Sequence, residues 1–231
     1  MLRPNFLTPL PVAADAAAMP AAPRVQCWQE EWANAASHGA GALLAAGCSP
    51  WAIAKAMAVG VLQGAGAVVF CATMVLLFTV SCVYHAARDH NWKRMLQRLD
   101  HAAIFLFIAG TYTPFLLGVL ADNGGPWALA GVWCVALLGV GAKLTDRIRH
   151  PLLSTLLYVG MGWMAAFMLG PLAREIPPAG VALIVAGGLL YTVGAVVFYF
   201  DDRIRFGHLL WHVLVLAACA CHFMAVAHFA V

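Results

Sequence analysis

The stretch LQGAGAVVFCATMVLLFTVSCVYH, residues 62–85, decides the fold class of this chain. It contains no Asp, Glu, Lys or Arg, and it exceeds the about 20 apolar residues that an α-helix needs to cross a bilayer. Six further apolar runs of similar length accompany it, so we predict an all-α membrane protein, a bundle of seven transmembrane helices. The predicted spans are 36–56, 62–85, 101–120, 126–144, 151–171, 179–199 and 207–229.

The composition of the whole chain agrees with lipid as its main solvent. Of the 231 residues, 63% are hydrophobic and 10% are charged, whereas about 25% of the residues of a soluble domain are charged. A globule of this size has too much surface to hide so many apolar side chains. The composition excludes a soluble enzyme and a disordered chain, and the runs lack the apolar–polar alternation of an outer-membrane barrel. A formal net charge of +3 gives no sign of a nucleic-acid partner.

Residues 1–27 predict a flexible N-terminal tail, followed by a seven-helix transmembrane domain over residues 28–231. Prolines and Asp15 interrupt the apolar core that a signal peptide would need. Residues 28–34, with two tryptophans and two glutamates, predict a short helix that lies in the membrane interface.

Three local features qualify the predicted spans. Ser49-Pro50 interrupts the first span, Pro114 predicts a kink in the third, and Thr111 or Thr113 is available to the carbonyls that this kink frees. The segment 86–99 is the one long loop. The seven cysteines form no Cys-x-x-Cys pair and lie mostly in apolar runs, so we predict them reduced and structural.

The basic residues predict the orientation, because cytoplasmic loops hold Lys and Arg in excess. With the N-terminus inside, all of the 13 Lys and Arg residues except Lys55 and Arg174 fall on the cytoplasmic side. The opposite orientation would reverse this ratio. We therefore expect a cytoplasmic N-terminus and a C-terminus outside.

Ionisable residues at membrane depth are costly, and each of them is a candidate functional residue. His85 ends the second span, Asp100 opens the third, and His208 and His212 open the seventh at i and i+4. Ser81 precedes His85 by one helical turn. In the predicted topology all of these groups lie near the cytoplasmic face.

Three imidazoles at one depth match a zinc site that leaves one coordination position open for water. Asp100 is then a candidate to accept the proton of that water, and Ser81 to bond a ligand or polarise a carbonyl. Any one histidine alone is better explained as a hydrogen-bonded packing residue, whereas the whole set favours a metal site. Another ion of similar ligand preference would suit the same set. Haem between facing helices fits the close histidine pair less well.

Other residues can be placed by the same geometry. His38 lies at the depth of the predicted site and is expected to support it, and Cys82 is a less favoured substitute ligand. His222 is expected to bond a neighbouring helix, and His228 to face the outer interface.

These motifs resemble the haemolysin III family, the bacterial branch of the progestin and adipoQ receptors, which include the adiponectin receptors. The segments that carry the resemblance, over about residues 30–229, are NAASHG (34–39), SCVYH (81–85), LDH (99–101), IAGTYTPF (108–115) and GHLLWH (207–212). The resemblance implies a seven-helix bundle with a cytoplasmic N-terminus in the bacterial inner membrane. It also implies Zn²⁺ held by His85, His208 and His212, with Asp100 and Ser81 nearby.

The resemblance leaves several functions open, because the superfamily also includes alkaline ceramidases. The first expectation is a zinc-dependent hydrolase of the lipid amidohydrolase type, which acts on amide or ester bonds of lipids or regulates membrane lipid homeostasis. Its partner would then be a membrane lipid, bound as an acyl-chain substrate or ligand. The alternatives are a receptor or sensor with structural zinc and a pore-forming haemolysin that causes cytolysis. No amphipathic insertion segment supports the pore, and the oligomeric state is open.

Overall fold

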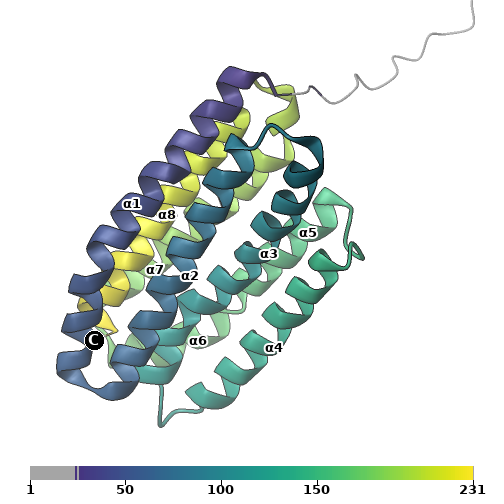
Figure 1. Cartoon of the computed structure of the whole chain (residues 1–231). Coiled ribbons are helices and arrows are strands. Elements are labelled where there is room, and N and C mark those ends of the chain that lie inside the picture. The colour runs from purple at the N-terminus through teal and green to yellow at the C-terminus, as the bar shows by residue number, and fades with distance from the viewer. Residues whose placement is uncertain (1–23, 25, 231) are drawn as a thin grey trace, which may run out of the picture.

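A computed structural model of the chain describes residue 24 and residues 26–230. Figure 1 shows a bundle of long helices that run side by side. The helices are α1 (Trp28–Val59), α2 (Val61–Ala86), α3 (His90–Pro114), α4 (Gly125–Leu144), α5 (Pro151–Trp163), α6 (Ala166–Glu175), α7 (Pro178–Tyr199) and α8 (Gly207–Phe229). Two short elements complete the chain, the π-helical η1 (Phe115–Val119) and the 3-10 helix η2 (Asp201–Arg203).

Seven segments are long and apolar enough to cross a membrane, because η1 continues α3 and α6 continues α5. The part of the chain that the structure describes contains no β-strand. The prediction of an all-α bundle with seven transmembrane helices is therefore confirmed. The start of α1 and the end of α8 lie at opposite ends of the bundle (Figure 1), as an odd number of spans requires.

Short-range signals set several helix ends. The Asp89 side chain accepts hydrogen bonds from the backbone N–H groups of Asn91 and Trp92, which starts α3. Proline stands in the first turn of α4, α5 and α7, where its missing N–H group is not needed. Gly124 has a φ of 80° just before α4, in the region that favours glycine.

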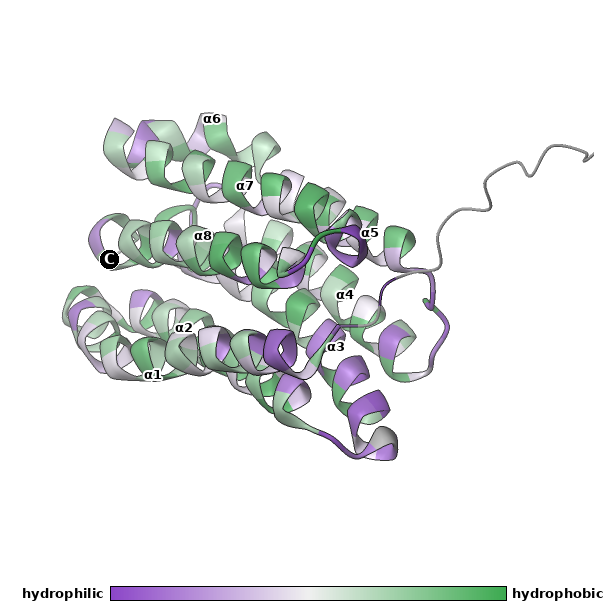
Figure 2. Ribbon diagram, turned by 90° about the horizontal axis from the view of Figure 1, so that it is seen from above, coloured by the Kyte–Doolittle hydropathy of each residue, from purple (hydrophilic) through white to green (hydrophobic). Residues whose placement is uncertain are grey.

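Helices α1, α2 and α8 form the part of the bundle that carries the candidate site. α1 packs against both α2 and α8, and α2 packs against α3. Gly41 allows α1 to approach α8 closely, because a Cβ atom there would lie 2.5 Å from Leu216 Cδ2. Many large hydrophobic side chains are exposed on the surface of the bundle, which lipid covers, and Figure 2 shows hydrophobic residues along the length of the helices.

The structure corrects the prediction for the first span. Residues 28–34 are not a separate interfacial helix but the first turns of α1, which continues without a break to Val59. Pro50 lies inside α1, where Ser49 donates a hydrogen bond to the carbonyl of Ala45. The packing of α1 against α2 and α8 keeps this helix continuous where the local sequence suggests an end.

The predicted long loop is also mostly helical, because α3 begins at His90. Its first turns carry Lys93, Arg94 and Arg98. These charges end the apolar run from which a span is predicted, but they do not end the helix. Hydropathy therefore marks where a span enters the hydrocarbon, not where its helix begins.

The third and fifth spans depart from regular helix. α3 gives way to η1 after Pro114, and Thr113 and Thr111 donate hydrogen bonds to the carbonyls of residues 109 and 108. The carbonyl that loses its donor to Pro114 is that of residue 110, so the hydroxyls bond its neighbours instead. The predicted span 151–171 is divided into α5 and α6. Next to that break, the Tyr112 hydroxyl lies 2.7 Å from the Met161 carbonyl oxygen.

All seven cysteines are free in the described part of the chain, as predicted. The predicted flexible tail lies almost wholly outside the described residues, which include only residues 24, 26 and 27 of it.

Candidate metal centre

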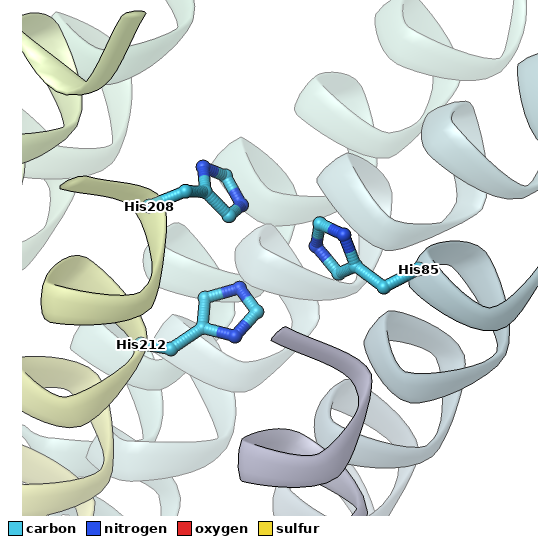
Figure 3. A group of neighbouring side chains, drawn as sticks. All are labelled: His85, His208 and His212. Atoms are coloured by element: carbon cyan, nitrogen blue, oxygen red, sulfur yellow. The ribbon is translucent and has the colours of Figure 1, made fainter. Parts of the chain in front are cut away.

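Three histidine side chains converge where α2 ends and α8 begins (Figure 3). His85 lies in the last turn of α2, and His208 and His212 lie in the first two turns of α8. Ring nitrogens of the three residues lie within 4.8 Å of one another. The His85 ring centroid is 5.0 Å from each of the other two, which are 4.8 Å apart. The residues that the sequence nominates as metal ligands are thus brought together.

Carboxylates hold the outer nitrogens of two of these rings. His85 Nδ1 lies 2.8 Å from Glu31 Oε2, and His208 Nδ1 lies 2.5 Å from Asp201 Oδ2. An ionised carboxylate only accepts hydrogen bonds, so each ring donates through Nδ1–H. The lone pair of each neutral ring is then on Nε2.

A hydroxyl group holds the third ring in the same state. His212 Nδ1 lies 3.0 Å from Ser37 Oγ, and the Ser37 hydroxyl donates its single proton to the Asn34 carbonyl, 2.8 Å away. Ser37 Oγ therefore accepts a hydrogen bond from His212 Nδ1–H. This leaves the Nε2 lone pair of His212 free as well.

The three Nε2 atoms are buried and have no hydrogen-bond partner among the described residues. Unpaired buried nitrogens are costly, and here three of them meet in one small space. Three neutral histidine nitrogens, each with its other nitrogen hydrogen-bonded, are the ligand set of a zinc ion with one open position. The residues present therefore fit a zinc ion.

Asp100 and Ser81 lie beside this cluster but do not belong to it. Both side chains are buried, and Ser81 lies one helical turn before His85 on α2. Ser81 Oγ also lies 2.7 Å from Nδ1 of His38. The His38 ring stacks on that of His212, with centroids 3.5 Å apart and planes 5° apart. The expected contact of His38 with the site is confirmed.

Sequence comparison identifies the family. The family model described as Haemolysin-III related matches residues 26–223 of the chain. The chain belongs to the haemolysin III family. It is 38% identical over 204 residues to the Hemolysin-3 homolog of Bacillus subtilis (strain 168), which covers 88% of this chain and 95% of that relative. It is 37% identical over 199 residues to Hemolysin-3 of Bacillus cereus, which covers 86% of this chain and 90% of that relative.

A weaker similarity extends beyond bacteria. The human monocyte to macrophage differentiation factor is 29% identical over 161 residues, which cover 65% of this chain and 64% of that protein. Family membership and the seven spans make this haemolysin III protein a multi-pass integral membrane protein, which in bacteria lies in the inner membrane.

An apolar cavity of about 260 Å³ lies within the haemolysin III bundle. His38, whose ring stacks on that of His212, contributes a polar side chain to its lining, as do Asp100, His101 and His222. Helices α3, α5, α6, α7 and α8 all contribute to its walls, which are mostly aliphatic and aromatic. The cavity suits a ligand that is largely apolar.

The remaining predicted residues lie away from the centre. Cys82 faces Gly39 of α1 and is not in the histidine cluster, so the proposal of Cys82 as a substitute ligand is wrong. His222 Nε2 lies 3.3 Å from the Ile184 carbonyl of α7, so its expected bond to a neighbouring helix is confirmed. His228 is exposed, as expected.

Sequence reasoning missed the residues that hold the rings, namely Glu31, Ser37 and Asp201. Glu31 reaches His85 from a position 54 residues earlier in the chain, and Ser37 reaches His212 across 175 positions. Asp201 is only seven positions from His208. The sequence does place acidic residues just outside spans that carry histidines at the same predicted depth, and this pattern could have indicated partners for the histidine rings.

Proposed function

We propose that this haemolysin III protein is a zinc-dependent, hydrolase-like membrane protein. It cleaves amide or ester bonds of membrane lipids or regulates the lipid composition of the membrane. The observation that carries the proposal is the convergence of three buried, unpartnered Nε2 atoms whose rings are fixed through Nδ1. A zinc ion on three histidines supplies a Lewis acid and a water whose pKa falls toward about 7.

Asp100 is the proposed proton acceptor. Its carboxylate is buried and lines the cavity together with His38, whose ring stacks on that of His212. Ser81 is the proposed partner of this carboxylate, and the His38 ring holds the Ser81 hydroxyl at 2.7 Å. Protein groups thus hold the acceptor in place before substrate arrives.

The proposed substrate is a lipid whose acyl chain occupies the cavity. The walls offer mostly apolar contacts, and we place the polar linkage of the lipid beside Asp100 and His38, which also line the cavity. An apolar lining favours a bound acyl chain over a path for ions. The distribution of basic residues supports a cytoplasmic N-terminus and hence a centre near the cytoplasmic face.

The first test is the metal content of the detergent-purified protein beside a His208→Ala/His212→Ala variant. We expect about one zinc per wild-type chain and none in the variant, whereas His150→Ala, a change at an exposed histidine, should keep the zinc. Zinc-loaded protein is then screened against lipid amides and esters. A folded wild type without metal would contradict the proposal.

The Asp100→Asn variant separates the hydrolase from its nearest competitor. The competitor is a receptor or sensor in which zinc is purely structural. The hydrogen bonds of the three histidines already connect α1 to α2 and to α8, and His208 to the turn before α8, so a zinc ion there would tie these elements together. A hydrolase loses turnover in Asp100→Asn and keeps its zinc. A structural tie shows no turnover at all, and chelation lowers its melting temperature.

The names of the Bacillus relatives refer to haemolysis, and a pore predicts ion conductance across vesicles that contain the purified protein. Such conductance in the wild type and in the zinc-free variant alike would replace the hydrolase proposal.

A further inference from the structure

Glu30, the neighbour of Glu31, is buried with all of its acceptor capacity in use. Its side chain is 2% exposed. Oε1 accepts hydrogen bonds from Arg24 Nη2 at 2.6 Å and from the Phe206 backbone N–H at 2.8 Å. Oε2 accepts from Arg24 Nη1 at 2.7 Å and from the Cys27 backbone N–H at 3.0 Å. The bond to Cys27 caps α1, but the other three are not needed for a helix cap.

One of these three bonds, from the Phe206 backbone N–H, connects the start of α1 to the turn between η2 and α8, 176 positions away. Arg24 Nη2 also donates to the Ile204 carbonyl at 3.1 Å. Phe206 has a φ of 59°, a left-handed conformation that is strained for a bulky aromatic residue. Strained residues persist where their surroundings fix them, and the carboxylate of Glu30 fixes the backbone N–H of Phe206.

The same turn places His208. Phe206 is the N-cap residue of α8 and stands two positions before His208. Asp201, which holds His208 Nδ1, lies at the other end of the turn. Gly207 packs directly on it, because a Cβ atom at Gly207 would lie 2.9 Å from Asp201 Cα. The conformation of residues 201–207 therefore decides how the His208 ring is presented.

We propose that Arg24 and Glu30 are positioning residues of the metal centre, which clamp residues 201–207 and so hold His208 against His85 and His212. This proposal rests on the proposed metal-binding function. In this proposal Glu31 orients His85, the ligand on α2, and Glu30 orients His208, the first ligand on α8, through the Phe206 backbone.

The test measures the rate at which the zinc-loaded full-length protein releases zinc to a chelator. Loss of groups that orient metal ligands typically weakens binding about 10- to 100-fold, and we expect about tenfold faster release in Glu30→Gln and in Arg24→Met because they act through the turn. Glu175→Gln, a change at an exposed glutamate on α6, serves as the matched control and should not alter release.

Combined variants distinguish a clamp on His208 from a general loss of stability. If Glu30 acts through the 201–207 turn, Glu30→Gln and Asp201→Asn perturb the same ligand, and their joint effect on release is smaller than the product of the single effects. Glu30→Gln combined with Glu31→Gln should give the full product, because Glu31 acts on His85. Independent effects in both pairs would overturn the clamp.

Failure of the clamp is distinguishable from failure of the proposed function. A folded wild type that binds no zinc removes the metal centre itself. A wild type that binds zinc, with unchanged release in Glu30→Gln and Arg24→Met, removes only the clamp. If Glu30→Gln does not yield folded protein, Arg24→Met decides, since Arg24 lies before α1 and is exposed.

Discussion

Replacing Glu31 with glutamine tests whether the partner of His85 tunes the metal centre. Glu31 Oε2 accepts from His85 Nδ1–H at 2.8 Å, and the His85 side chain is only 2% exposed. Hydrogen bonds to charged groups contribute about 1.5–3 kcal/mol and neutral ones about 0.5–1.5 kcal/mol. Glutamine keeps an acceptor but loses the charge, so the change weakens this bond by about 1–1.5 kcal/mol. Since about 1.4 kcal/mol is tenfold in affinity, we expect the Kd for zinc to rise about tenfold.

The assay is competition for zinc between the detergent-purified protein and a chromophoric chelator. Lys93→Met is the matched control, because Lys93 forms an ion pair with the other oxygen of Glu31 at 2.7 Å. Both side chains of this pair are about one quarter exposed, and such pairs contribute about 0–1 kcal/mol. Lys93→Met should therefore change the Kd by about fivefold at most. A Kd within twofold of wild type in Glu31→Gln, alongside lost binding in His85→Ala, would refute the reasoning.

Two further predictions concern packing and the cavity. Gly110→Ala places a Cβ atom 2.0 Å from Thr73 Oγ1 and should destabilise the bundle by about 1–3 kcal/mol. Its control, Gly160→Ala, meets nothing within 4 Å and should stabilise the bundle by about 0.5–1 kcal/mol. Thermal melting in detergent measures both variants, and equal melting temperatures would contradict the close approach of α3 to α2. Ile108→Trp fills the cavity and should reduce lipid turnover with zinc content unchanged, while Leu138→Trp on the exposed face of α4 should alter neither; full turnover in Ile108→Trp would show that the acyl chain binds elsewhere.

The fold was largely predictable because lipid allows few solutions. A chain segment that crosses a bilayer must satisfy its backbone internally, so seven apolar runs of sufficient length imply seven helices. The errors in the predicted helix boundaries occur where a helix is longer than its apolar run, because the extra turns carry charged residues. Residues 28–34 and the start of α3 are helical but charged or amphipathic, and they extend each helix beyond the apolar run. The break between α5 and α6 was not predictable, because the Tyr112 contact at this break comes from another helix.

The candidate site was predictable as far as its ligands. His208 and His212 share a helical face by spacing alone, and the alternation of helix direction brings His85 and Asp100 to the same end of the bundle. The partners of the rings follow from tertiary contacts. Ser37, for example, reaches His212 only because α1 packs against α8 along its length.

The missing partners can be explained by charge balance. Three neutral histidines would leave the two positive charges of a zinc ion uncompensated in a buried site, and buried charges are stable only when they are paired. Glu31 and Asp201 each place a carboxylate against Nδ1 of a ligand ring. Two negative charges therefore lie on the far side of the rings whose Nε2 atoms would bind the ion. Ser37, in contrast, brings a neutral hydroxyl group to His212. Removing both carboxylates should therefore weaken zinc binding far more than removing the Ser37 hydroxyl.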